Sequence, residues 1–223
     1  MNILLYLKKR IKSFLGSRKI AVTFHKKTDR EPIIDLANTV YRETSTGLSF
    51  NELIQLYFAV KSVDDVDGDI AEVGVFQGGS AKVICEAKGT KNLHLFDTFE
   101  GLPEIEEIDS EKFYTGQYKS DFESTVEYLR DYRNVFFYKG IFPETTSPVE
   151  DCSFSLAHLD VDTKKSTDAC LHFFYPRMNS GGIILCHDYG IARGVRLTVD
   201  EFFIDKPETV VRLSENQCLI VKF

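Results

Sequence analysis

The chain has 223 residues, of which 43% are hydrophobic and 27% are charged, and its formal net charge is −7. This length suits one domain with a terminal extension, and the apolar fraction suffices for a packed core. The charge is uneven, because residues 1–30 carry +8 and the remainder carries −15. An acidic body lacks the basic surface that phosphate binding needs, which argues against a nucleic-acid partner.

The cysteines are odd in number and form no CxxC pair. They are Cys85, Cys152, Cys170, Cys186 and Cys218. Most fall in apolar runs, a pattern typical of buried free thiols in a reducing compartment rather than of a disulfide framework or a zinc site. We therefore expect a cytoplasmic protein.

Residues 1–31 form a predicted basic amphipathic extension. Apolar side chains recur at helical spacing among lysines and arginines: Ile3, Leu4, Leu7, Ile11, Phe14 and Leu15. The apolar run precedes the basic cluster, unlike a signal peptide, and it is too short to span a bilayer. Two interpretations stay open: packing on the domain or on a second subunit of a homo-oligomer, which we slightly favour, and peripheral contact of residues 1–19 with an anionic membrane.

Residues 32–66 are predicted to form helices that cover the ligand-binding unit of residues 68–80. A helix begins at Pro32, a favourable first position, and extends to Tyr41. A second helix follows Ser49, with Glu52 at the capping-box position. Residues 67–223 form the predicted catalytic domain.

Residues 68–80 are the centre of that domain. A short apolar run breaks at Gly74 and again at Gly78 and Gly79, and a helical pattern follows over residues 81–87. Strand, glycine turn and helix hold a nucleotide-like ligand at the carboxyl end of a sheet. The spacing is neither GxGxxG nor a Walker loop.

Two acidic residues indicate which ligand this unit binds. Glu72 lies inside the first strand, where a carboxylate suits a cationic ligand such as S-adenosylmethionine (SAM). Asp97 ends the next strand, 23 residues after Gly74, close to the roughly 20-residue offset at which an acidic residue meets a ribose hydroxyl. The sequence therefore predicts SAM binding, against the alternative of an ordinary βαβ unit whose glycines serve packing.

The remaining chain alternates strands and helices. Strands are predicted over residues 93–97, 135–138, 154–159, 181–186, 209–213 and 217–221, and helices over 122–132, 166–174 and 194–203, with Ser166 as a cap. Residues 98–121 are too long for an ordinary connection and form a predicted functional loop or lid. The order implies a mostly parallel sheet with an antiparallel edge and a terminal pair of strands.

Several motifs together resemble the macrocin O-methyltransferase family of class I SAM-dependent methyltransferases. They are GDIAEVGVFQGGS at 68–80, FDTFEGLP at 96–103, GIFPET at 140–145, LDVD at 159–162 followed by Ser166-Thr167, and the stretch from Pro176 through Gly181-Gly182 to Asp188-Tyr189-Gly190. The resemblance covers residues 68–203. It implies a Rossmann-like class I methyltransferase fold, with a mostly parallel seven-stranded sheet, an antiparallel C-terminal strand and N-terminal helices.

The resemblance also implies roles for individual residues. The methionine part of SAM would lie among Glu72, Gly74, Gly78 and Ser80; the ribose would lie at Asp97, and the adenosine near Phe99 and Gly140. The family's divalent metal, often magnesium, would lie at Asp160, His187 and Asp188. This chain departs from the family at His187, which replaces an acid, and at Lys164, which replaces an aromatic residue. Magnesium prefers oxygen ligands, so the options are a weaker site, a softer metal such as manganese or zinc, or His187 acting as a base without metal.

The predicted chemistry is transfer of the SAM methyl group to a hydroxyl of a sugar, glycoconjugate or small metabolite. Asp160 or His187 would accept the hydroxyl proton, and a metal would lower the hydroxyl pKa. Structural roles compete: Asp162 as a cap of the next helix, and His187 in a hydrogen bond at a strand end. Alternative functions are a non-methylating or metal-free relative in glycan or lipid biosynthesis, and a SAM-binding adaptor docked to a membrane or a complex.

Overall fold

The computed structural model describes residues 31–223, and the chain divides into two units, Met1–Asp35 and Leu36–Phe223. The basic amphipathic pattern predicted over residues 1–31 lies outside the described residues, apart from Glu31. The second unit contains the sheet and the candidate site. No helix within residues 31–223 combines the length and the apolar character needed to cross a bilayer.

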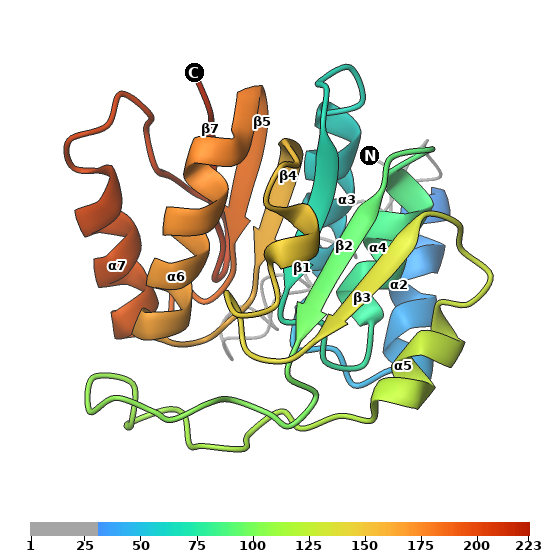
Figure 1. Cartoon of the computed structure of the whole chain (residues 1–223). Coiled ribbons are helices and arrows are strands. Elements are labelled where there is room, and N and C mark those ends of the chain that lie inside the picture. The colour runs from blue at the N-terminus through green and yellow to red at the C-terminus, as the bar shows by residue number, and fades with distance from the viewer. Residues whose placement is uncertain (1–30) are drawn as a thin grey trace, which may run out of the picture. The chain divides into compact units, whose positions relative to one another are not determined.

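A seven-stranded sheet organises the second unit (Figure 1). Its strands are β1 (Asp69–Val73), β2 (Leu93–Asp97), β3 (Val135–Lys139), β4 (Phe154–Leu159), β5 (Met178–Cys186), β6 (Val211–Arg212) and β7 (Cys218–Val221). The order is β3-β2-β1-β4-β5-β7-β6, in which β1 to β5 pair in parallel and β7 pairs antiparallel with both neighbours. The predicted mostly parallel sheet with an antiparallel C-terminal strand is confirmed.

Helices cover both faces of this sheet (Figure 1). They are α2 (Glu31–Glu43), α3 (Phe50–Ser62), α4 (Gly79–Ala87), α5 (Phe122–Tyr128), α6 (Lys164–Phe174) and α7 (Arg193–Phe203), with 3-10 turns η1 (Ser147–Val149) and η2 (Tyr175–Arg177). The apolar side chains of α3 and α4 pack on one face, and those of α6 and α7 pack on the other. Both faces are therefore buried, which explains why successive residues of β1 and β4 are buried with no alternation between faces.

Most helix ends lie within two residues of the sequence prediction, but the cap at the start of α6 and the end of α5 differ from it. α6 begins at Lys164 because Thr163 is its cap: the backbone of Thr163 is extended, and its side chain accepts a hydrogen bond from the amide of Ser166. The predicted caps Ser166 and Asp162 are therefore wrong. α5 ends at Tyr128 rather than at residue 132, because Leu129 leaves the helix and is buried in the core.

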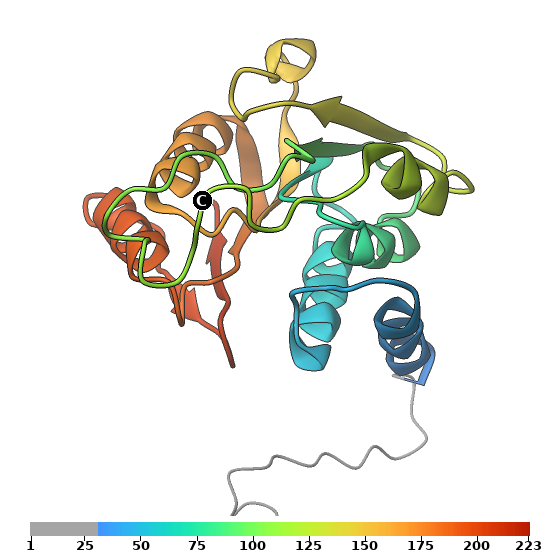
Figure 2. The same cartoon turned by 90° about the horizontal axis from the view of Figure 1, so that it is seen from below.

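The segment of residues 98–121 contains no helix or strand and crosses the carboxyl edge of the sheet (Figure 2). Its two halves pair where the amide of Leu102 donates to the carbonyl of Gln117 at 2.8 Å and the amide of Gly116 donates to that of Leu102 at 2.9 Å. At its far end the buried carboxylate of Asp109 accepts a hydrogen bond from the amide of Lys164 at 2.9 Å. The segment is thus anchored to the start of α6.

Candidate active site

A cavity of about 210 Å³ lies at the carboxyl edge of the sheet. Parallel strands bring their carboxyl ends to one edge, so residues distant in sequence meet there. The 98–121 segment contributes several lining residues, among them Tyr118. The others include residues at or just after the ends of the first five strands: Gly74, Asp97, Gly140, Asp160, His187 and Asp188.

Asp97 holds the turn between β1 and α4. One carboxylate oxygen accepts hydrogen bonds from the amides of Val75 and Phe76, at 2.7 and 2.8 Å, and the other accepts from the amide of Phe99 at 2.7 Å. A carboxylate offers about four lone-pair sites, so these three bonds leave capacity for a ligand hydroxyl. Asp97 therefore both builds the turn and faces the cavity.

Gly74 permits β1 and β4 to meet at the cavity. Its φ is +90°, and a Cβ added there would lie 1.8 Å from the carbonyl oxygen of Asp160. The amide of Asp160 donates to the carbonyl of Val73 at 2.9 Å. Only glycine fits this close backbone approach.

Glu72 is fully buried behind the cavity lining. Its Oε1 lies 2.9 Å from Nδ1 of His158, whose side chain is also fully buried, and its Oε2 has no hydrogen-bond partner among the described residues. Burial raises the pKa of Glu72, against the opposing influence of His158 and Ser80. The sequence does not reveal this histidine pairing, because it joins strands β1 and β4.

The seven predicted cofactor residues divide into two groups in the structure. Gly74, Asp97 and Gly140 line the cavity. The others support it from behind and are not part of its lining: Glu72, Gly78, Ser80 and Phe99. Gly78 is the cap of α4, Ser80 is buried in the first turn of that helix, and Phe99 packs against Phe122.

The predicted metal residues Asp160, His187 and Asp188 come together. Nδ1 of His187 lies 2.9 Å from Oδ1 of Asp160 and 3.0 Å from Oδ2 of Asp188. Asp188 adopts a left-handed backbone with a φ of +61°, an uncommon conformation that turns it back toward the histidine. One donor atom from each residue falls within 4.8 Å of the others.

Glu52 is a fourth member of this cluster that sequence reasoning assigned only to helix capping. Its Oε2 accepts from the amide of Ser49 at 2.8 Å and lies 3.4 Å from Nε2 of His187. Its Oε1 accepts from the amide of Asn216 at 2.9 Å. The capping box is confirmed, but the same carboxylate also reaches a residue 135 positions later, which no local pattern could indicate.

In this cluster, neighbouring charges shift the side-chain pKa values more than burial does. Burial would lower the pKa of His187, but Asp160, Asp188 and Glu52 raise it. Burial would raise the pKa of Asp160 and Glu52, but His187 lowers both, with backbone amides helping to bring the pKa of Glu52 to about 2. Without a metal, the cluster therefore holds a charged imidazole between carboxylates.

The donor set fits a divalent transition metal. Neither ring nitrogen of His187 makes a hydrogen bond of good geometry, although carboxylate oxygens lie around both, and Oδ2 of Asp188 is also unpaired. Two carboxylates and one imidazole are suitable ligands for manganese or zinc, whereas magnesium prefers oxygen alone.

Comparison with known proteins identifies the family. The family model described as macrocin-O-methyltransferase (TylF) matches residues 25–209. The chain belongs to this family. The match includes the cavity residues that follow β1 to β5.

Curated proteins with similar sequences are named as O-methyltransferases. The chain is 29% identical over 167 residues to a Streptomyces olivaceus protein, 8-demethyl-8-(2,3-dimethoxy-alpha-L-rhamnosyl)-tetracenomycin-C 4'-O-methyltransferase, covering 66% of this chain and 63% of the relative. It is 27% identical over 161 residues to demethyldecarbamoylnovobiocin O-methyltransferase of Streptomyces niveus, covering 62% of this chain and 59% of the relative. The matched region thus spans less than two thirds of these relatives.

Solved structures show the same fold over a larger share of the chain. The O-methyltransferase NovP superposes with a TM-score of 0.69 over 98% of both chains at 22% identity. The calicheamicin methyltransferase CalS11 gives a TM-score of 0.67 over 89% of this chain and 95% of its own at 16% identity. The predicted Rossmann-like class I methyltransferase fold is confirmed.

Proposed function

We propose that this chain is a SAM-dependent O-methyltransferase that methylates a hydroxyl of a sugar or sugar-bearing small molecule. The observation that carries the proposal is one cavity that joins two sets of residues. Gly74, Asp97 and Gly140 form a cradle suited to a nucleoside, and Asp160, His187 and Asp188 form an acidic cluster suited to a hydroxyl. Membership of the macrocin-O-methyltransferase family supports both assignments.

The cofactor half holds SAM, which supplies a methyl group on a positively charged sulfonium. Asp97 accepts a hydrogen bond from a ribose hydroxyl with its remaining lone-pair site, while its bonds to Val75 and Phe76 keep the turn in place. Gly74 lets the ligand approach the backbone closely. Glu72 contributes a buried carboxyl group next to β4, and His158 orients it.

The acceptor half positions a hydroxyl and takes its proton. Because the surrounding carboxylates keep His187 protonated, Asp160 is the better proton acceptor and His187 holds Asp160 in place. Asp188 lies at the same ring nitrogen as Asp160, and Glu52 lies at the opposite one, so carboxylates flank the imidazole at both nitrogens. Alignment of the hydroxyl with the methyl carbon then supplies the remaining acceleration.

Activity with and without Asp160 tests the proposal. We expect wild-type protein to bind SAM in calorimetry and to methylate glycosides from an acceptor panel that includes rhamnosides. Asp160→Asn should reduce kcat by about 10²–10⁴-fold, the usual contribution of a general base, with little change in SAM affinity. The matched control Asp168→Asn removes an exposed carboxylate from α6 and should leave kcat unchanged. Failure of the wild type to bind SAM would contradict the proposal, whereas SAM binding without methylation of any acceptor would favour the SAM-binding adaptor.

A divalent metal would be held by Asp160, His187 and Asp188, and when bound it would lower the pKa of the acceptor hydroxyl. Because one ligand is an imidazole, we expect chelated enzyme to recover activity with manganese or zinc in preference to magnesium. His187→Asp combined with Glu52→Gln should shift this preference toward magnesium, since it supplies a third oxygen ligand without crowding a fourth carboxylate. Full activity after chelation would instead support the metal-free alternative.

A further inference from the structure

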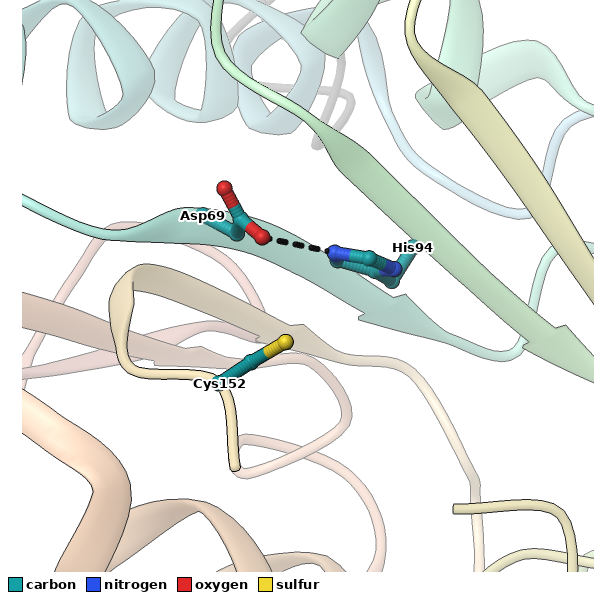
Figure 3. Close-up of side chains that lie close together, drawn as sticks. All are labelled: Asp69, His94 and Cys152. Atoms are coloured by element: carbon teal, nitrogen blue, oxygen red, sulfur yellow. Dashed lines mark hydrogen bonds and ion pairs between the residues drawn. The ribbon is translucent and has the colours of Figure 1, made fainter. Parts of the chain in front are cut away.

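A second group of metal-binding side chains lies at the opposite edge of the sheet from the cavity. Asp69 is the first residue of β1, His94 is the second residue of β2, and Cys152 precedes β4 by two residues. Figure 3 shows these three side chains converging, and one donor atom from each lies within 4.8 Å of the others. None of them lines the cavity.

The histidine ring is held in a fixed orientation. Its Nε2 lies 2.9 Å from Oδ2 of Asp69, and its Nδ1 lies 3.0 Å from the hydroxyl of Tyr138. The ring stacks against Phe136 and Tyr138, with centroids 5.5 and 5.8 Å away. Oδ1 of Asp69 accepts a hydrogen bond from the side-chain amide of Asn92 at 3.1 Å. Both residues therefore have the outer partners that orient metal ligands.

We propose that Asp69, His94 and Cys152 bind a zinc ion. Carboxylate, imidazole and thiolate are all zinc ligands, and one neutral with two anionic ligands balances the charge of the ion. Tetrahedral coordination at zinc–ligand distances of about 2.0–2.3 Å separates ligand atoms by about 3.3–3.8 Å. The 2.9 Å distance between Oδ2 of Asp69 and Nε2 of His94 needs to lengthen slightly. The sulfur of Cys152 lies within 4.8 Å of a donor atom of each residue and needs to approach by at most about 1 Å. Water would take the fourth position.

The three side chains can move to these distances while His94 keeps its contact with Tyr138 and Asp69 keeps its contact with Asn92. When zinc takes Nε2, the remaining ring proton sits on Nδ1 and is donated to the hydroxyl of Tyr138, which can either donate or accept. The side chain of Asp69 is 23% exposed and Cys152 is partly exposed, so an ion can enter from solvent. The ring of His94 is almost buried, with 7% of its side chain exposed, which favours retention of a bound ion.

The spacing of these residues in the sequence gives no indication of a metal site. The ligands come from three separate segments and include only one cysteine, so no CxxC pattern marks it. The inference does not depend on the proposed methyltransferase activity.

Titration of the metal-free protein with cobalt(II) tests the site, because a cobalt–thiolate bond gives an intense near-ultraviolet charge-transfer band that carboxylates and imidazoles do not give. We expect the wild type to develop this band with one equivalent of cobalt and to lose it when zinc is added. Cys152→Ser should abolish the band, and it should bind one zinc ion fewer per chain than the wild type. The Asp160 cluster contains no thiol, so metal bound there does not contribute to the band.

Two further variants make the test decisive. Asp151→Asn removes an exposed neighbouring charge and should keep the band at full intensity. Tyr138→Phe removes the outer hydrogen bond and should retain the band while weakening cobalt binding about 10–100-fold. A wild type without the band, or a folded Cys152→Ser protein that retains it, would show that Asp69 and His94 form only a hydrogen-bonded pair. Circular dichroism without metal establishes that each variant is folded.

Discussion

At the scale of single residues, the candidate site depends on positions with little freedom. Gly74 is the clearest, because the strands β1 and β4 approach there with no room for a side chain. Asp97 is similarly constrained, since one of its oxygens bonds to two amides of the turn after β1 and the other bonds to the amide of Phe99. One backbone turn thus serves the fold and the cofactor half of the cavity together.

Replacement of Gly74 by alanine should reduce both the stability of the fold and the affinity for SAM. The added Cβ would lie 1.8 Å from the carbonyl oxygen of Asp160, so the strand ends must separate. The control Gly89→Ala has a comparable left-handed φ of +60° but no atom within 4 Å of the new Cβ, and it should cost only about 1–2 kcal/mol of backbone strain. We expect Gly74→Ala to cost clearly more than the control in urea unfolding and to weaken SAM binding. Equal costs would contradict the close-approach argument.

At the scale of elements, the amino end of α3 connects distant parts of the site. The carboxylate of Glu52 bonds to the amide of Ser49 on its own helix and to the amide of Asn216 before β7, and it also contacts His187 after β5. The helix is therefore positioned by the site as much as by its apolar contacts. The capping bond between Ser49 and Glu52 therefore also orients the carboxylate that contacts His187.

Glu52→Gln should destabilise the protein in a pH-dependent way. The replacement weakens charge-assisted hydrogen bonds in a buried setting, with an expected cost of about 1–3 kcal/mol at neutral pH. The pKa of Glu52 falls from 4.5 to about 2 in the folded state, so its contribution is present above pH 4.5 and is lost as the pH falls from there toward 2.

The measurement is urea unfolding of the variant and the wild type at several pH values. The difference in unfolding free energy should shrink as the pH drops below 4.5. Ser49→Ala, which removes only the cap hydroxyl, should cost about 1 kcal/mol and show no comparable pH dependence. A constant difference between Glu52→Gln and the wild type would indicate that the carboxylate charge is not involved.

At the scale of the whole molecule, the segment of residues 98–121 is the part best placed to respond to ligands. It crosses the carboxyl edge of the sheet (Figure 2) and contributes Tyr118 to the cavity. Hydrogen bonds of Leu102 with Gly116 and Gln117 pair its two halves, while Asp109 at the start of α6 and Ser120, which donates to the carbonyl of Phe76, attach it to the rest of the domain. Because the segment contains no helix or strand, fewer backbone hydrogen bonds hold it than hold the sheet, which makes local opening easier there.

Bound SAM should protect this segment from trypsin. Lys112 and Lys119 are exposed cleavage sites within it. If opening of the segment prevents binding, SAM at 100 times its dissociation constant should slow cleavage there about 100-fold. Lys61, at the exposed end of α3, is the control site and should be cut at an unchanged rate. Equal cleavage with and without SAM would show that the segment does not close over the ligand.

Local patterns in the sequence were enough to predict the strands, most helices and the glycine turn. The apolar runs of β1 and β4, the capping box at Ser49 and the alternation of strands with helices are all properties of short segments. Helix ends were less predictable, because Thr163 competes with Asp162 and Ser166 for one capping position. Strand order also explains why Asp160 and Asp188 meet, since parallel neighbours end at one edge.

Periodicity and short motifs are enough to predict the fold class and to show the resemblance to the family, and that resemblance in turn implies the cluster of Asp160, His187 and Asp188. The pairing of side chains emerges only in the folded chain: Glu72 with His158, Glu52 with His187, and Asp69 with His94 beside Cys152. Each of these pairs joins residues from different strands or helices. Their proximity arises from the register and packing of the sheet, and no local pattern of residue types carries that information.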